Sequence, residues 1–139
     1  MLLGVVCGCS RKPDADDAAF LCALSDAQTS LHALRALEQR DTNETARVLQ
    51  VKVCQSIRFL PAYRDSTSLT DEQRLEAVRA GRNVLDWLEE SFSSVDRNLS
   101  HNCLLGLADL LDSPGDRKRI ELLRQRWDND RSNQALHGD

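Results

Sequence analysis

Apolar residues recur every three or four positions through most of the chain, which is the spacing that places them on one face of an α-helix. The first stripe predicts a helix over about residues 16–40 and consists of Phe20, Leu24, Ala27, Leu31 and Leu34. The second predicts a helix that ends before Pro61, because the residue preceding a proline disfavours the α conformation. Its stripe is Ala46, Leu49, Val53, Ile57 and Leu60, widened by Val48, Val51 and Cys54. The short break at residues 40–42 between the two helices predicts an antiparallel hairpin.

Three further helices follow from start signals and apolar stripes. Residues 70–73, Thr-Asp-Glu-Gln, form a capping box that opens a third helix. A fourth helix is expected from about Asn98. Residues 113–116, Ser-Pro-Gly-Asp, combine an N-cap serine, a proline at the first helical position and an acidic third position, which predicts a fifth helix that frays after Asp130. The apolar stripe of the third helix is Leu75, Val78, Leu85 and Leu88, flanked by Trp87 and Phe92. The stripe of the fourth helix is Leu99, Cys103, Leu107, Leu110 and Leu111, and that of the fifth helix is Ile120, Leu123 and Trp127.

These elements predict an all-α fold, an up-and-down bundle of about five helices built from helical hairpins. Composition agrees, since a chain of 139 residues with 41% apolar residues, 4% aromatic residues, six glycines and three prolines has the make-up of one helical domain. The isolated Gly81 inside the third helix predicts close helix packing at that point. The formal charge of −4 gives no electrostatic reason to bind nucleic acid. No stretch approaches the roughly 20 consecutive apolar residues of a membrane-spanning helix.

The amino terminus has a different character from the body. A short apolar run over residues 2–6 leads into Val6-Cys7-Gly8-Cys9, and polar residues follow at once from Ser10. This segment resembles a bacterial lipobox, in which a branched apolar residue and small residues precede the cysteine that becomes lipidated. The resemblance implies lipidation of Cys9. Together with the helix pattern, the resemblance predicts four parts of the chain: a signal remnant (1–8), a tether (9–17), the helical bundle (18–131) and a frayed tail (132–139).

This segment predicts that the chain is a small envelope lipoprotein. It would be lipid-anchored in the bacterial envelope, face the periplasm and have a non-enzymatic binding or structural role as an adaptor, an accessory subunit or an immunity-type inhibitor. Its partners would be the membrane and an unidentified protein, with no small-molecule substrate, metal or other cofactor. The alternative is a cytosolic interaction module, because residues 34–49 resemble the hairpin turn of tetratricopeptide-type repeats, although no second copy follows at their period. A thiol-dependent enzyme that uses Cys54 or Cys22 is a third possibility.

Five cysteines suit an oxidising compartment. If residues 1–8 are removed and Cys9 is acylated, Cys22, Cys54 and Cys103 remain. Straight antiparallel helices would place Cys54 seven residues, or about 10 Å, from the level of Cys22. They would also place Cys103 well below Cys54, so a disulfide is disfavoured unless tilted or re-routed helices restore it, and we expect Cys103 to be buried as a small hydrophobe. The chain's histidines lie on different segments, without a zinc-binding spacing.

Two groups of residues are candidate partner contacts. Phe59 and Tyr63 bracket Pro61, and we expect them to be buried together at the end of the bundle; exposed together, they could anchor a partner. Arg117 and Arg124 belong to a basic edge of the last helix. Acidic residues dilute this edge, so it is expected to be a solvated face that could also bind an acidic partner or anionic head groups.

Overall fold

The computed structural model describes residues 15–38, 43–63 and 67–136. This part of the chain contains five α-helices and one 3-10 helix, η1, and no strand, which confirms the predicted all-α fold. The elements are α1 (Ala15–Glu38), α2 (Asn43–Phe59), η1 (Leu60–Tyr63), α3 (Asp71–Ser91), α4 (Arg97–Leu110) and α5 (Pro114–Leu136). The lipobox-like segment, with Cys7 and Cys9, lies outside the described residues. Helix α1 begins inside the expected tether, and α5 continues beyond Asp130 into the expected tail.

Local capping determines where three of the helices begin. The Thr70 hydroxyl accepts the Gln73 N–H at 3.2 Å and the Gln73 side chain accepts the Thr70 N–H at 2.8 Å, so the predicted capping box of α3 is present. The Asp96 carboxylate accepts the Asn98 N–H at 2.9 Å and caps α4. The Asp116 N–H donates to the Ser113 hydroxyl at 3.1 Å at the start of α5, as predicted. Each contact satisfies backbone N–H groups that have no partner within the helix.

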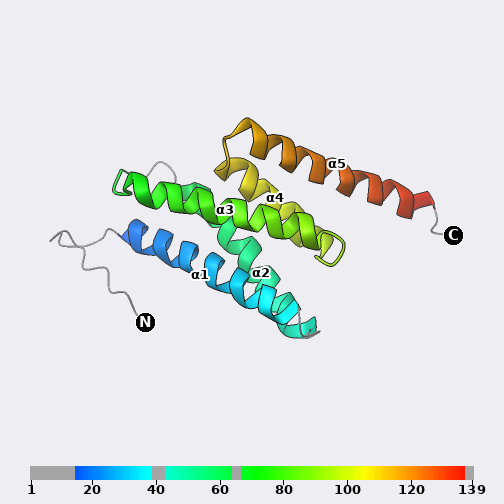
Figure 1. The fold of residues 1–139 in the computed structure, drawn as a ribbon, viewed down its shortest axis with the longest axis horizontal. Helices are drawn as coiled ribbons and strands as arrows, with labels where there is room; N and C mark the ends of the chain where they lie inside the picture. The colour runs from blue at the N-terminus through cyan, green and yellow to red at the C-terminus, as the bar shows by residue number, and fades with distance from the viewer. Residues whose placement is uncertain (1–14, 39–42, 64–66, 137–139) are drawn as a thin grey trace.

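The helices alternate in direction and stack as hairpins (Figure 1). Helices α1, α3 and α5 run one way, and α2 and α4 run the other way. Helix α2 packs against α1 and also extensively against α4, while α3 contacts α1, α4 and α5. α-Helices that are separated in the sequence by one other α-helix are therefore direct neighbours. The contact between α2 and α4 is the most important example, because it brings together residues that a simple sequential tracing keeps apart.

The core follows most of the predicted stripes, with two exceptions. Trp87, Val53, Ile57, Leu85 and Leu107 are completely buried. Leu75 was expected in the core of α3 but is 58% exposed, and Val48 of α2 is 57% exposed. Both residues lie on the side of their helix opposite the buried stripe. In α3, the buried stripe is centred on small residues. The buried residues of α3 are Ala77, Ala80, Gly81, Val84, Leu85, Trp87 and Leu88.

Two glycines allow helices to approach closely. A Cβ atom at Gly81 of α3 would lie 2.9 Å from a methyl group of Leu110, which confirms the predicted role of this glycine in helix packing. A Cβ atom at Gly106 of α4 would lie 2.8 Å from the carbonyl oxygen of Ile57 and 3.0 Å from the Cα of Arg58. The backbones of α2 and α4 are thus almost in contact at Gly106.

Candidate functional site

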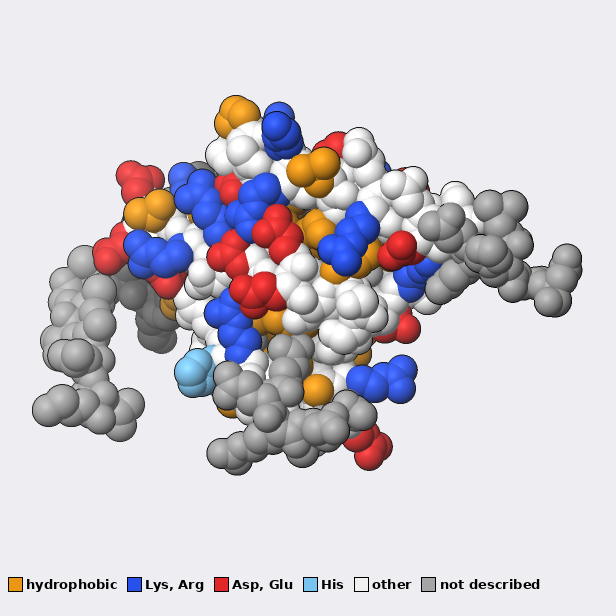
Figure 2. Space-filling view, turned by 45° about the vertical axis from the view of Figure 1, so that its right-hand side comes forward, with side chains coloured by type: hydrophobic (Ala, Val, Ile, Leu, Met, Phe, Trp, Pro, Cys, Tyr) orange, Lys and Arg blue, Asp and Glu red, His pale blue; other side chains and the backbone are white. Residues whose placement is uncertain are grey.

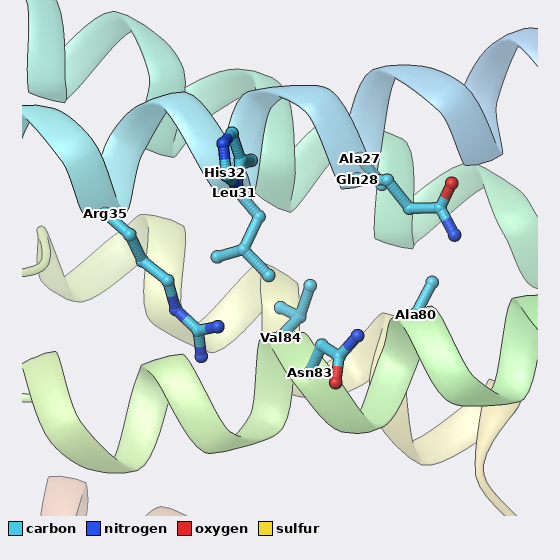
Figure 3. Close-up of a pocket in the computed structure, with 8 residues that line it drawn as sticks. All are labelled: Ala27, Gln28, Leu31, His32, Arg35, Ala80, Asn83 and Val84. Atoms are coloured by element: carbon cyan, nitrogen blue, oxygen red, sulfur yellow. The ribbon is translucent and has the colours of Figure 1, made fainter. Parts of the chain in front are cut away.

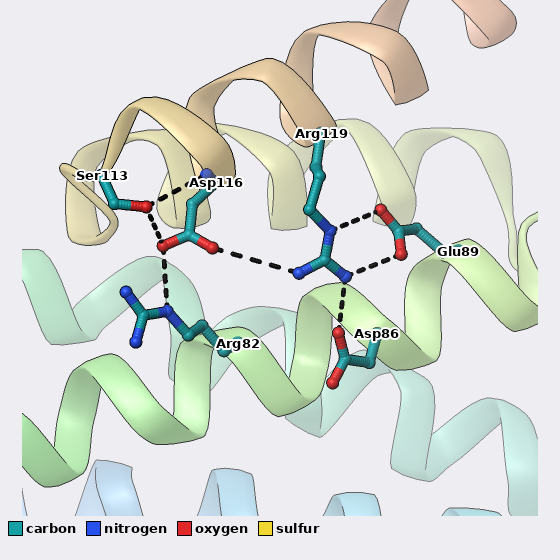
Figure 4. A network of polar contacts seen from close by, with 6 residues as sticks. All are labelled: Arg82, Asp86, Glu89, Ser113, Asp116 and Arg119. Carbon is teal, nitrogen blue, oxygen red and sulfur yellow. Dashed lines mark hydrogen bonds and ion pairs between the residues drawn. The ribbon is translucent and has the colours of Figure 1, made fainter.

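A network of charged side chains joins α3 to the first two turns of α5 (Figure 4). The guanidinium of Arg119 donates to both carboxylate oxygens of Glu89, at 2.8 and 2.7 Å, and to Asp86 at 2.5 Å. The hydrogen bonds to Glu89 and then to Asp86 raise the pKa of Arg119. The planar guanidinium suits this paired arrangement, in which two parallel hydrogen bonds fix the orientation of α5 on α3.

Asp116 is the buried member of this network. Its side chain accepts hydrogen bonds from the Ser113 hydroxyl at 2.6 Å and from Arg82 Nε at 2.9 Å. Burial raises the pKa of Asp116, but the hydrogen bonds from Ser113 and Arg82 and the charges of Arg82 and Arg119 outweigh it and lower this pKa below its ordinary value. Asp116 therefore remains ionised and holds the start of α5 against α3. These charges satisfy one another, so we assign the network a structural role.

The predicted basic edge of α5 is divided in the structure. Arg119 points into the network, and the Arg126 guanidinium lies 4.5 Å from the ring centre of Phe92. The two candidate partner contacts remain on the surface: the side chain of Arg117 is 66% exposed with Asp112 at 3.6 Å, and that of Arg124 is 52% exposed with Glu121 at 4.0 Å. Figure 2 shows acidic and basic side chains interleaved on the face in view, which fits the expected solvated surface.

The aromatic pair around Pro61 is separated. Phe59, at the end of α2, is 61% exposed, so the expectation that it is buried together with Tyr63 was wrong. Tyr63 packs against the core, with its ring edge-to-face to that of Phe20 at 6.2 Å. The chain passes from α2 into the 3-10 helix η1 after Phe59, and the two rings lie in different environments. Phe59 alone remains an exposed aromatic contact candidate.

The cysteines of the helical body are free thiols, of which Cys22 is exposed and Cys54 and Cys103 are buried. Burial of Cys103 was predicted, but the level assigned to it was wrong. A hydrogen bond with Cys54 is the largest cause that raises the pKa of Cys103, followed by burial, so the two thiols lie against each other. Helix α2 packs directly against α4, and this contact sets the register between the two helices. The register of α4 on α2 consequently brings Cys103 level with Cys54.

A cluster around Trp127 was not predicted. The Trp127 ring of α5 stacks on His101 with ring centres 5.4 Å apart, and the Arg97 guanidinium lies 5.3 Å from the ring centre. The Trp127 Nε1–H is buried without a hydrogen-bond acceptor, beside a cavity of about 50 Å³ that Arg124 and Asp128 also line. The spacing of Arg97 and His101, one helical turn apart, is the sequence signal that marks this face of α4.

A shallow groove of about 170 Å³ runs between α1 and α3 (Figure 3). Its apolar floor includes Leu31 and Val84, and its polar rim includes Gln28, Arg35 and Asn83. Gln28 also donates a hydrogen bond of 2.7 Å across the groove to Glu76 of α3. The groove has the size of a single amino-acid side chain or a very small ligand.

Within residues 15–38, 43–63 and 67–136, no three His, Cys, Asp or Glu side chains are grouped so that they could hold a metal ion. None of the helices in the described ranges is long and apolar enough to span a bilayer. Comparison of the chain with protein-family models, with curated proteins and with solved structures finds no match.

Proposed function

We propose that this chain is a small bacterial envelope lipoprotein, anchored through Cys9, whose periplasm-facing helical body has a binding or structural role. The observation that carries the proposal is the segment Val6-Cys7-Gly8-Cys9 with its polar continuation. The position of the hydrophobic core in the sequence is compatible with cleavage of the chain before Cys9. The first core residue in the described part of the chain is Phe20, so cleavage before Cys9 removes no residue of that core. The body would then be attached through a short polar tether.

The anchor is tested by metabolic labelling with a radioactive fatty acid in a bacterial host, followed by fractionation of the cells. The wild type should be labelled and recovered with membranes, and Cys9→Ala should lose both properties. Cys7→Ala is the matched control, because alanine has the small size that this position requires, and Cys22→Ala is a control in the helical body. Equal labelling of wild type and Cys9→Ala, or no labelling of either, would contradict the proposal.

The binding role is assigned to the exposed side chains Phe59, Arg117 and Arg124. Aromatic and arginine side chains contribute strongly to protein interfaces because they combine a large contact area with hydrogen bonding. The expected partner is another envelope protein. In cross-linking of intact cells, Phe59→Ser and the double variant Arg117→Ala/Arg124→Ala should reduce a cross-linked product that the wild type gives. Val48→Ser replaces an equally exposed apolar residue on the same helix as Phe59 and should leave the product unchanged.

The second candidate is a cytosolic helical-hairpin interaction module. The packing of α2 on α4 and of α1 on α3 favours it, because stacked hairpins are the arrangement of helical repeat proteins. The fractionation experiment separates the two candidates. Full-length, unlabelled chain that retains Met1 in the soluble cell fraction supports the module, whereas labelled chain that begins at Cys9 supports the lipoprotein.

A further inference from the structure

The thiols of Cys54 and Cys103 form a buried pair between two helices that are distant in sequence. Cys54 is 1% exposed and Cys103 is completely buried. The two thiols lie against each other across the interface of α2 and α4, and this contact is the largest cause that raises the pKa of Cys103. This is the only pairing among the three cysteines in the described residues, since Cys22 lies on the surface of α1.

The backbone geometry around the pair favours a covalent link. A disulfide needs Cα atoms within about 7 Å, which neighbouring helices reach only where their backbones approach closely. Gly106 allows that approach, because even a Cβ atom there would touch the backbone of Ile57 and Arg58. Helices α2 and α4 run in the same direction (Figure 1). One turn before this contact on both helices, the facing residues are Cys54 and Cys103, so the two cysteines share the register that the glycine sets.

We propose that Cys54 and Cys103 are joined by a disulfide when the chain folds in an oxidising compartment, and that the structure represents the reduced form. The oxidant is a disulfide, either of a small thiol such as glutathione or of a thiol oxidoreductase. One cysteine thiolate attacks the oxidant and forms a mixed disulfide, releasing one thiolate. The second cysteine thiolate then attacks the protein sulfur of the mixed disulfide and releases the other. Two protein S–H bonds are lost, one protein S–S bond forms, and the oxidant accepts two electrons and two protons.

The burial of both thiols determines at which stage of folding the disulfide can form. The thiolate is the reactive species, and in the folded protein both thiols are inaccessible while the pKa of Cys103 is raised. Exchange in the native state should therefore be slow. The bond should form while α2 and α4 are still assembling and should then resist reduction once the helices have packed. Its occurrence in the cell depends on the proposed export, but the chemistry of the pair does not.

The test uses the purified full-length chain with Cys7→Ser, Cys9→Ser and Cys22→Ser, which leaves only the two buried cysteines. The reduced, unfolded chain is refolded in a buffer of oxidised and reduced glutathione, quenched in acid and treated with an alkylating reagent. We expect a product that is lighter by two hydrogen atoms, is not alkylated, and gives a peptide linked through Cys54 and Cys103. Adding Cys103→Ala to this chain is the control and should give only a glutathione adduct or an alkylated thiol.

The equilibrium constant for forming the disulfide should also depend on whether the chain is folded. Because the fold and the disulfide stabilise each other by the same free energy, the equilibrium constant for oxidation should be on the order of a hundredfold larger in native buffer than in concentrated urea. Two alkylated thiols after refolding, or equal oxidation in native buffer and in urea, would overturn the proposal. Neither outcome depends on the lipid anchor, since the test chain lacks Cys9. Failure of this inference is thus distinguishable from failure of the proposed function.

Discussion

Replacement of Gly106 by alanine tests the contact between α2 and α4 on which the register of the bundle depends. The added Cβ would lie 2.8 Å from the Ile57 carbonyl oxygen and 3.0 Å from both the Cα and the N of Arg58. All three are backbone atoms, so no side-chain rotation relieves the overlap and the helices must separate by several tenths of an ångström. Overpacking of this kind costs about 1–3 kcal/mol. The better helix propensity of alanine returns up to about 1 kcal/mol.

The net expectation for Gly106→Ala is a loss of up to about 2 kcal/mol in the free energy of unfolding. Urea unfolding followed by far-UV circular dichroism measures this loss. Gly115→Ala is the matched control, because the nearest atom to its new Cβ is the Ser113 hydroxyl oxygen at 4.0 Å. Gly81→Ala should fall between the two, since the atoms it meets are methyl groups of leucine side chains that can shift. A Gly106→Ala variant as stable as Gly115→Ala would refute the close approach of α2 and α4.

Three further outcomes are expected from other parts of the structure. Because folding lowers the pKa of Asp116, its contribution to stability is present above about pH 4, the usual unfolded pKa, and is lost as the pH falls through the folded pKa. The stability difference between wild type and Asp116→Asn, measured by urea unfolding, should therefore shrink in acid, and a difference that stays constant to low pH would contradict this reasoning. The Arg119 and Glu89 side chains are 34% and 37% exposed, so water weakens their ion pair. A double-mutant cycle with Arg119→Met and Glu89→Gln should give a coupling energy of about 0.5–1 kcal/mol. A coupling energy near zero would show that the pair does not hold α5 on α3. Phe59→Ser should change the unfolding free energy by less than about 0.5 kcal/mol, because the ring is 61% exposed, and a loss of several kcal/mol would show that the ring is buried.

The features that the sequence predicts correctly are local ones. The capping box at Thr70 and the Ser113-Pro114 start of α5 require only residues within one helical turn, and both form as expected. The stripe of α2 was also correct at Val53 and Ile57, because large apolar residues at helical spacing define a face without reference to other helices. A chain of this composition therefore reveals its helices with little ambiguity.

The face of α3 was harder to identify because small residues form it. Ala77, Ala80 and Gly81 contribute little apolar surface themselves, yet they let neighbouring helices approach closely. Leu75 has the larger side chain, and its size led the predicted stripe to the wrong side of the first turn. Size alone was a poor guide here, because what decides burial in α3 is how closely α1 and α4 pack against it.

The pairing of Cys54 with Cys103 could not be predicted, because it depends on the register between helices that are not consecutive. Each helix advances 1.5 Å per residue, so an unknown displacement of a few residues in the connection that contains η1 moves the later helices by a distance larger than a disulfide can span. Only the contact of α2 with α4 fixes that displacement. Gly106 provides that contact, since a larger residue would hold the helices apart at the level of Ile57. The glycine and the two cysteines therefore depend on one register: a shift of α4 by a single turn along α2 would remove both the close approach and the thiol contact.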